Sequence, residues 1–411
     1  MHAPSPSQPP AQRNLSKGLT LLLAIACGAL VANLYYAQTL IDTIGPEVGL
    51  SPQIAGSITT LTQLGYGAGL ALFVPLGDLF ENKRLALVTT FGAILGSVGI
   101  ALSGGPAIFL AASLVTGVCA TGAQVLLPLA SHLATEERQG RVIGTIMSGL
   151  LFGIMLARPA ASFLAHLLGW RSIFYVSAAL MTAIWLALFV YCPERRPEGK
   201  LGYGQILASV AGQLRQYRAL RLRAFYQAML FAAFNLFWTA APLELLHNFD
   251  FSQEQVAWFA LAGAGGALAA PLAGSLADRG LMWWTSLGAL LMLTLSFVGA
   301  DFAAAATSVI AFAVTAVLID AAVQLNQITG QKIIFALSKE ARARVNAAYM
   351  TVMFVFGASG SLIGSATFES GGWTLSALTG AAMGGITLIV FIFFDRGASA
   401  TTNSAGGNSP A

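Results

Sequence analysis

Two ionisable residues lie deep inside long apolar stretches of the chain. Arg158 follows Arg141 by 17 positions, which corresponds to roughly 25 Å along a helix. Asp320 precedes Lys332 by 12 positions, or roughly 18 Å at the same rise per residue. An unpaired charge in hydrocarbon costs from about 3 to more than 10 kcal/mol, so both side chains must face a partner, a cavity or the protein interior. We therefore expect either a fixed ion pair between them or a site where one or both bind a substrate or a proton.

Glutamines extend this polar surface at helical spacing. Asp320, Gln324 and Gln327 recur at i, i+4 and i+7, which places them on one face of a helix. Gln124 lies in a similar polar stripe of another apolar segment. Such faces are expected to point at a central cavity, although hydrogen bonding between helices is an equally ordinary role for one glutamine.

A short polar and aromatic segment occurs twice, 202 positions apart. Asn33 and Tyr36 correspond to Asn235 and Trp238, and we expect the two pairs to face each other across the centre of the molecule. Aromatic rings with a polar atom suit flat or amphipathic organic molecules. The alternative is an aromatic belt at a membrane surface, which suits Trp258 better than Tyr36.

The composition places these residues in a membrane. Of 411 residues, 56% are hydrophobic and 9% are charged, against roughly a quarter charged in soluble domains, which excludes a water-soluble enzyme. Apolar runs of this length, without the alternation of a barrel strand, must be helices. Twelve runs are found, at residues 16–40, 53–76, 85–103, 106–133, 141–168, 170–192, 223–246, 254–277, 283–300, 304–330, 344–367 and 374–394.

Positive charge is concentrated on one side of these runs. Of the 21 lysines and arginines, 19 fall on one side if both termini are cytoplasmic, and Arg171 is the only one in the opposite loops. This distribution follows the positive-inside rule. We expect a multi-pass protein of the bacterial inner membrane with both termini in the cytoplasm.

Internal repeats divide the chain into two halves. Six matches occur in the same order at offsets of 200 to 203, including Gly169-Trp170 with Gly372-Trp373. The fold class expected is all-α integral membrane, with 12 transmembrane helices in two pseudo-symmetric six-helix bundles, as in a large class of transporters. The expected parts are a disordered tail (1–14), a six-helix bundle (15–192), a basic cytoplasmic connector (193–222), a second six-helix bundle (223–395) and a disordered tail (396–411).

Acidic residues recur at two equivalent helix ends, each beside basic residues. We expect them to bind these cations across the cytoplasmic face in one conformation and to release them in another, although aspartate is also common in turns. The expected cytoplasmic gate comprises Asp78, Lys83, Arg84, Asp278 and Arg279.

The sequence contains no residue pattern typical of a catalytic, metal or cofactor site. The three cysteines and four histidines lack metal or catalytic spacing, so we expect no enzyme, no catalytic residues, no metal and no cofactor. Gly263, Gly265 and Gly266 lie inside an apolar run, where close helix packing explains them. The basic connector is expected to hold a surface helix near Gln205–Arg223 that is attracted to anionic lipid rather than to nucleic acid.

Several segments together resemble a known family. They are Asn33–Leu40 (NLYYAQTL), the loop that carries Asp78, Lys83 and Arg84, and its second copy Gly274–Arg279 (GSLADR). Over roughly 15–395 the chain resembles the major facilitator superfamily, in particular the twelve-helix proton antiporters that export drugs, sugars and purine nucleosides. The resemblance implies alternating access and export of a small molecule.

We therefore expect a monomeric secondary transporter that exports a small organic molecule, driven by proton entry, with Asp320 and Arg158 as the proton-coupling residues. A proton-coupled importer of a small metabolite is the alternative, and Arg158 would then suit an anion. A membrane sensor or scaffold without transport is the alternative from another class. The residues expected to bind substrate are Asn33, Tyr36, Gln124, Arg158, Asn235, Trp238, Asp320 and Gln324.

Overall fold

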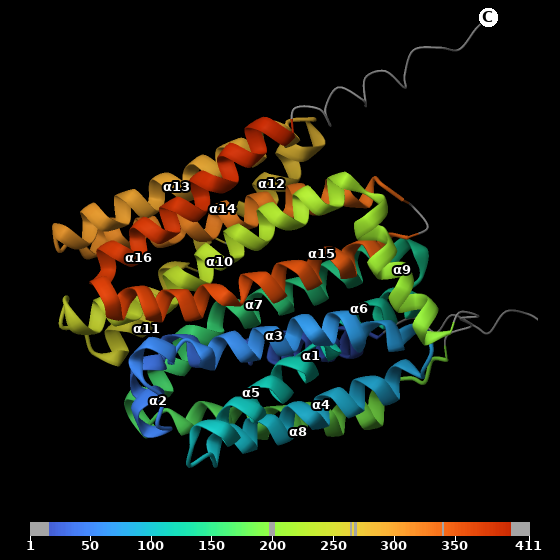
Figure 1. The fold of residues 1–411 in the computed structure, drawn as a ribbon. Coiled ribbons are helices and arrows are strands. Elements are labelled where there is room, and N and C mark those ends of the chain that lie inside the picture. The colour runs from blue at the N-terminus through green and yellow to red at the C-terminus, as the bar shows by residue number, and fades with distance from the viewer. Residues whose placement is uncertain (1–15, 197–201, 264, 267–268, 339–340, 396–411) are drawn as a thin grey trace, which may run out of the picture.

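The computed structural model describes residues 16–196, 202–263, 265–266, 269–338 and 341–395. Long helices run side by side in two groups, the N half below and the C half above in Figure 1. The two tails expected at 1–14 and 396–411 lie outside the described residues. The N half contains α1 (Lys17–Ala32), η1 (Tyr36–Thr39), α2 (Ile41–Glu47), η2 (Pro52–Ile54), α3 (Ser57–Leu72), η3 (Val74–Asp78), α4 (Asn82–Ala101), α5 (Pro106–Ala120), α6 (Gly122–Leu133), α7 (Glu136–Leu168) and α8 (Arg171–Tyr191).

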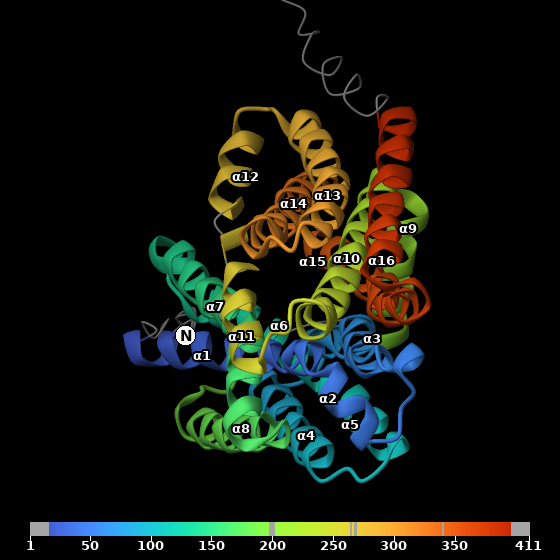
Figure 2. The ribbon, with the colours of Figure 1, turned by 90° about the vertical axis from the view of Figure 1, so that its left-hand side faces the viewer.

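The C half follows a connecting helix, α9 (Tyr203–Gln216). We call the end of the molecule that carries α9 the connector end, and the opposite end, which carries α2, the far end (Figure 1). Figure 2 looks along the helices and shows α7 beside α11 on one side of the molecule. The C half contains α10 (Arg218–His247), α11 (Gln253–Gly263), α12 (Ala269–Asp278), α13 (Met282–Ala305), α14 (Val309–Phe335), α15 (Arg342–Gly357) and α16 (Ser359–Phe394).

These helices make the twelve spans that the apolar runs predict. Eight described segments are long and apolar enough to cross a membrane, and one of them, Arg344–Phe394, contains two spans that meet at a break in α16. The other three spans are each interrupted: α1 with η1, α3 with η3, and α11 with α12. Large apolar side chains on the outer surface, such as Phe302 and Ile310, suit contact with lipid.

The internal repeat is visible in the packing of two tryptophans. Gly169 and Gly372 both have positive φ, 81° and 66°, and each precedes a buried tryptophan. Trp170 packs against Phe109, with ring centres 6.0 Å apart, and Trp373 packs in the same way against Phe312, at 4.8 Å. Phe109 and Phe312 are themselves 203 positions apart. The same turn and aromatic contact therefore occur once in each half.

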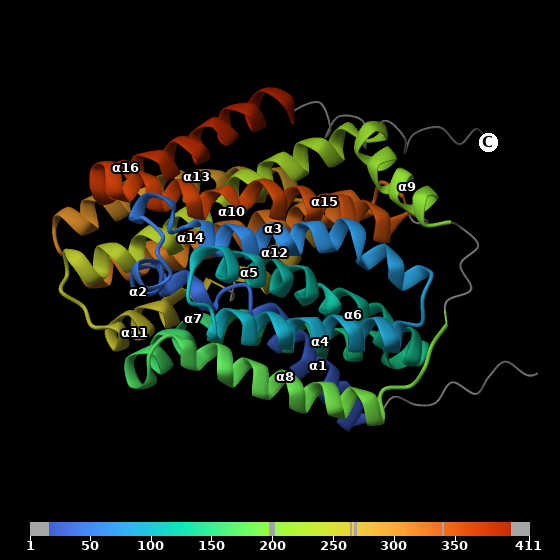
Figure 3. The same cartoon turned by 60° about the horizontal axis from the view of Figure 1, so that its bottom comes forward.

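The connecting helix differs from its expected position near Gln205–Arg223. It ends at Gln216, and α10 begins at Arg218. It also touches both halves: the Tyr203 hydroxyl donates to the Leu72 carbonyl oxygen of α3 at 2.8 Å, and Arg344 of α15 donates to the Ser209 hydroxyl at 3.2 Å. Figure 3 shows α9 at the connector end, beside α15.

Two ion pairs fix the ends of the bundle. At the far end, Arg171 donates to Glu47 at 2.5 Å and holds the pKa of that carboxyl below its usual value. At the connector end of the C half, Arg223 binds Asp395 at 2.6 Å, and both side chains are only 5% exposed. Arg223 also donates to the Ser286 hydroxyl at 2.7 Å. This buried pair joins the start of α10, helix α13 and the residue that follows α16.

Small residues let α1 and α7 approach each other closely. A side chain at Gly28 would collide with the backbone of Gly149, and one at Gly153 would collide with the backbone of Gly28. Such contacts between small residues are a usual means of helix association in membranes.

We expect Gly153→Leu to lower the stability of the purified protein by about 1–3 kcal/mol, because the leucine must push α1 away from α7. Thermal unfolding in detergent measures the effect. Gly144→Leu on the same helix is the matched control, since nothing lies within 4 Å of its position. Equal effects of the two substitutions would contradict the close contact.

Candidate functional site

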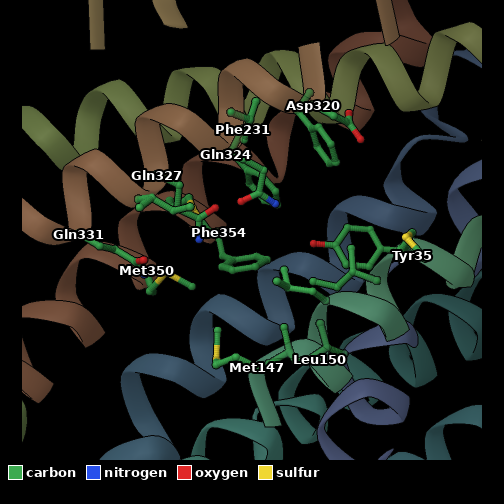
Figure 4. Close-up of a pocket in the computed structure, with 18 of the residues that line it drawn as sticks. Tyr35, Met147, Leu150, Phe231, Asp320, Gln324, Gln327, Gln331, Met350 and Phe354 are labelled. Atoms are coloured by element: carbon green, nitrogen blue, oxygen red, sulfur yellow. Dashed lines mark hydrogen bonds between the residues drawn. The ribbon is translucent and has the colours of Figure 1, made fainter. Parts of the chain in front are cut away.

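A cavity of about 390 Å³ lies between the two halves (Figure 4). Its walls come from α1, α3, α6 and α7 of the N half and from α10, α11, α14 and α15 of the C half. A second hollow of about 330 Å³ shares Gln124, Phe335 and Asn346 with it and reaches Arg342 toward the connector end. The lining side chains that bear on function are Tyr35, Tyr66, Gln124, Met147, Leu150, Arg158, Phe231, Phe234, Asp320, Gln324, Gln327, Gln331, Asn346, Met350 and Phe354.

Arg158 lies at the end of the cavity away from the connector and is only 4% exposed. Its Nε donates to the Gln38 side-chain oxygen at 3.0 Å. The centre of its guanidinium group lies 4.5 Å from the Trp238 ring, 4.9 Å from Phe234 and 5.0 Å from Tyr35. Its Nη2 is buried and has no hydrogen-bond partner among the described residues. Aromatic faces stabilise the cation, but part of its donor capacity is unused.

Asp320 lies opposite, on α14, and accepts a hydrogen bond from the Trp238 indole N–H at 2.8 Å. Among the ion pairs of the described residues, none joins Asp320 to Arg158. Trp238 thus contacts both charges. Gly263 and Gly266 provide the space, because a side chain at the first would collide with Trp238 and one at the second with Asp320. The close packing expected of these two glycines is confirmed.

Three amide side chains join the halves beside this site. Asn235 exchanges two hydrogen bonds with Gln63, at 2.7 and 2.8 Å, and accepts a third from Gln38 at 3.1 Å. All three side chains are fully buried. Toward the far end, the Thr60 hydroxyl donates to the Ala358 carbonyl oxygen at 2.8 Å. These contacts close the cavity on its far-end side.

Comparison with known proteins decides the family. The sequence profile of the Major Facilitator Superfamily matches residues 21–234 and 223–410. The chain belongs to the Major Facilitator Superfamily. It is therefore a multi-pass membrane transporter and not an enzyme, as the sequence predicts.

Individual relatives agree with this assignment. The transporter is 42% identical to a protein named Uncharacterized transporter YgaY of Escherichia coli O157:H7, over 92% of this chain and 95% of that protein. It is 26% identical to a chloramphenicol resistance protein of Streptomyces lividans, over 63% of this chain and 66% of that protein. Its fold is similar to the crystal structure of a variant of the nucleoside transporter NupG, with a TM-score of 0.73, 14% identity and coverage of 91% and 99% of the two chains.

Four of the eight residues expected to bind substrate line the cavity of this superfamily member: Gln124, Arg158, Asp320 and Gln324. Gln124 donates to the Tyr66 hydroxyl oxygen at 3.1 Å. Asn235 and Trp238 lie one layer behind, where they hold Gln38, Arg158 and Asp320 through the contacts above.

The expected positions of Asn33 and Tyr36 are wrong. The Asn33 side-chain oxygen accepts hydrogen bonds from Ser97 and Ser177, at 3.2 and 2.8 Å, inside the N half. Tyr36 packs against Phe174 of α8. Neither residue faces Asn235 and Trp238 across the centre. Tyr35 takes the place expected of Tyr36 in the transporter's cavity (Figure 4).

Gln38 and Gln63 were not among the expected site residues, although a usable signal exists. Each is an amide side chain in the middle or near the end of a predominantly apolar run, and a buried amide needs hydrogen-bond partners. The argument that singled out Gln324 applies to them equally.

The described contacts of the transporter's gate residues lie within the N half. Asp78 is exposed, Arg84 pairs with Glu81 of its own turn at 2.8 Å, and Lys83 lies 5.9 Å from the Phe189 ring. Arg279 is exposed, and the Asp278 side chain lies outside the described part. Among described side chains, the gate contacts expected across the halves are therefore absent in this conformation.

We expect Asn235→Ala to shift the transporter toward a conformation that is open at the far end. The substitution removes three hydrogen bonds between the halves and leaves the buried amide N–H group of Gln38 and both polar atoms of the Gln63 side chain without these partners, which predicts a population shift of roughly tenfold or more. Asn33→Ala is the control given by the internal repeat, because the hydrogen bonds of the Asn33 side chain to described residues all lie within the N half.

Spin labels at Ser51 and Ser370 measure this shift. Both positions are exposed: Ser51 follows α2 in the N half, and Ser370 directly precedes the break in α16 at Gly371 in the C half. The labels are attached to introduced cysteines after Cys27, Cys119 and Cys192 are replaced. A longer distance is expected for Asn235→Ala only, and equal distances in the two variants would contradict the closure.

Proposed function

We propose that this transporter exports a small organic molecule across the bacterial inner membrane by alternating access, coupled to protons at Asp320. The observation that supports this proposal is the cavity between the halves, which has one buried acid and one buried base at its closed end. Ionisable groups buried within transmembrane helices usually mark a transport pathway.

Alternating access would move the two halves against each other around this cavity. The contacts among Gln38, Gln63 and Asn235 would break as the far end opens. The gate residues around Asp78 and Arg279 would then meet at the connector end. By the positive-inside rule the connector end faces the cytoplasm, so the conformation of the present structure, which is closed at the far end, would be the one that loads a molecule for export.

The outward direction has support from one relative, since the chloramphenicol resistance protein of Streptomyces lividans carries a name that suits drug export. The cavity volume of about 390 Å³ suits one small molecule. We further propose that the transporter acts as a monomer, because each chain contains both walls of its cavity.

The test has two stages with the full-length protein. A panel of candidate molecules is first screened for thermal stabilisation, since a ligand that binds the native state raises apparent stability by mass action. Each stabilising molecule is then loaded into proteoliposomes, and its movement is followed with and without an imposed pH gradient. Movement of the molecule in the direction opposite to proton flow supports proton exchange. Flux that ignores the pH gradient would contradict proton coupling, and binding without flux would contradict transport of that molecule.

Uptake of an anionic metabolite together with a proton is the second candidate. The unpartnered Nη2 of Arg158 favours it, because a carboxylate or phosphate would complete that donor. In this case the proton and the substrate would travel in the same direction, so external acid would accelerate uptake rather than export.

A further inference from the structure

Arg158 and Asp320 lie in one cavity without touching. Arg223 and Asp395 provide a comparison within the same chain, because they form a direct buried ion pair at 2.6 Å. At the closed end of the cavity, Trp238 contacts both groups instead, with its ring 4.5 Å from the guanidinium centre and its N–H bound to the carboxylate at 2.8 Å. One ring thus holds both charged groups, and no ion pair among the described residues joins them.

Both groups have hydrogen-bonding capacity left. The Arg158 side chain uses Nε for Gln38, while its buried Nη2 has no hydrogen-bond partner in the described part of the chain. Among the described residues, Trp238 is the hydrogen-bond donor to Asp320, and it occupies one carboxylate oxygen. A carboxylate accepts several hydrogen bonds and a guanidinium donates up to about five. A ligand group with an acceptor for Arg158 and a donor for Asp320 would satisfy both.

The charges of Arg158 and Asp320 determine which net charge of the ligand group is favoured. Ionised Arg158 and Asp320 sum to zero, so a neutral or zwitterionic group leaves the site neutral. A cation or an anion would leave one net charge among Tyr35, Phe234 and Trp238, and burying an uncompensated charge costs several kcal/mol.

The rest of the cavity indicates what the group is attached to. Phe354 packs against Phe231, with ring centres 4.9 Å apart, and Met147 and Leu150 of α7 line the opposite side of the cavity (Figure 4). Gln324, Gln327 and Gln331 form an uncharged polar strip along α14 toward the connector end. An apolar or aromatic body with uncharged polar substituents suits these walls.

We propose that the closed end of the cavity is a dipolar subsite. It binds a net-neutral head group that offers a hydrogen-bond acceptor to Arg158 and a donor to Asp320, as a zwitterionic amino acid or a primary amide does. The proposal rests on the proposed function, since it assigns the substrate class of the same cavity.

Four probes with one phenyl body test the proposal on the purified full-length chain. Phenylalanine is zwitterionic and phenylpropionamide is neutral, whereas phenylpropionate is an anion and phenylpropylamine is a cation. Affinities come from thermal shift titrations at fixed pH and salt. The two net-neutral probes are expected to bind at least about tenfold more tightly than the two ions.

Two substitutions should change this ranking in opposite directions. Asp320→Asn leaves a lone cation with almost unchanged shape, so phenylpropionate becomes the preferred probe. Arg158→Gln leaves a lone carboxylate, so phenylpropylamine becomes preferred. Asn33→Ala, which acts inside the N half, is the control and should keep the wild-type ranking.

Three results would overturn the dipolar subsite: preference of the wild-type chain for an ion, unchanged ranking in Asp320→Asn, or binding of none of the four probes. Asp320→Asn suffices if Arg158→Gln does not fold. These results are separate from a failure of the proposed function. Binding in the predicted order without flux in proteoliposomes would contradict transport and leave the subsite standing.

Discussion

Replacing Asp320 with asparagine is expected to abolish substrate accumulation driven by a pH gradient, while movement down the substrate's own gradient continues. Asparagine has the shape of aspartate and can still accept the Trp238 N–H, but it cannot take up and release a proton. One pH unit corresponds to about 1.4 kcal/mol per proton, or roughly tenfold accumulation, in the wild-type transporter. The variant should show none.

Proteoliposomes loaded with saturating substrate measure the effect, with the pH inside and outside set independently. Glu244→Gln is the matched control, because Glu244 is another buried acid of a spanning helix, 4% exposed, whose oxygen accepts a hydrogen bond from Asn248. Glu244→Gln should retain coupling. If Asp320→Asn keeps coupling, or if Glu244→Gln loses it, the proton acts elsewhere.

Replacing Asp395 with alanine is expected to lower the free energy of unfolding by about 3–5 kcal/mol, because it leaves the buried Arg223 charge without its partner. The loss of the contact between α10 and the residue after α16 would loosen the connector end of the C half. Thermal and denaturant unfolding in detergent measure the change.

The double variant Arg223→Met, Asp395→Leu gives the decisive comparison. Replacing both members of a buried ion pair with apolar residues is often neutral or stabilising, so this variant should unfold near the wild-type midpoint. Glu254→Ala is a surface control: Glu254 lies 3.8 Å from His166 and is 47% exposed, and an exposed pair contributes at most about 1 kcal/mol. Similar losses in Asp395→Ala and the double variant would show that packing, rather than charge, matters here.

The fold followed from the sequence because its determinants are local. Apolar runs set the spans, and repeated residues such as Gly169-Trp170 and Gly372-Trp373 set the two halves. The deep positions of Arg158 and Asp320 followed from counting residues along helices. Their contact through Trp238 did not, because a neutral side chain between two charges leaves no pattern of charge or spacing.

The errors at Asn33 and Tyr36 have a definite physical cause. Helix α1 ends at Ala32, and a turn and the 3₁₀ helix η1 follow. A 3₁₀ helix has about 3.0 residues per turn against 3.6 in an α-helix, so the faces of the segment cannot be extrapolated from α1. In the second copy, α10 continues through Asn235 and Trp238 to His247. Equivalent residues of the repeat therefore point in different directions.

That divergence has a consequence for how the molecule is assembled. Gln38 and Gln63 belong to the N half, and the asparagine that binds both belongs to the C half. Counting 202 positions on from Gln38 gives Ala240, which has no amide to offer. Two copies of the C half could not form the contacts among Gln38, Gln63 and Asn235, because the C half has no counterpart of Gln38. Two copies of the N half would have only Asn33 in the place of Asn235, and Asn33 already binds two serines. When the halves are produced as separate polypeptides, an N half should bind a C half in preference to a second N half. Each half therefore depends on the other to complete this contact, although the two are repeats of one another.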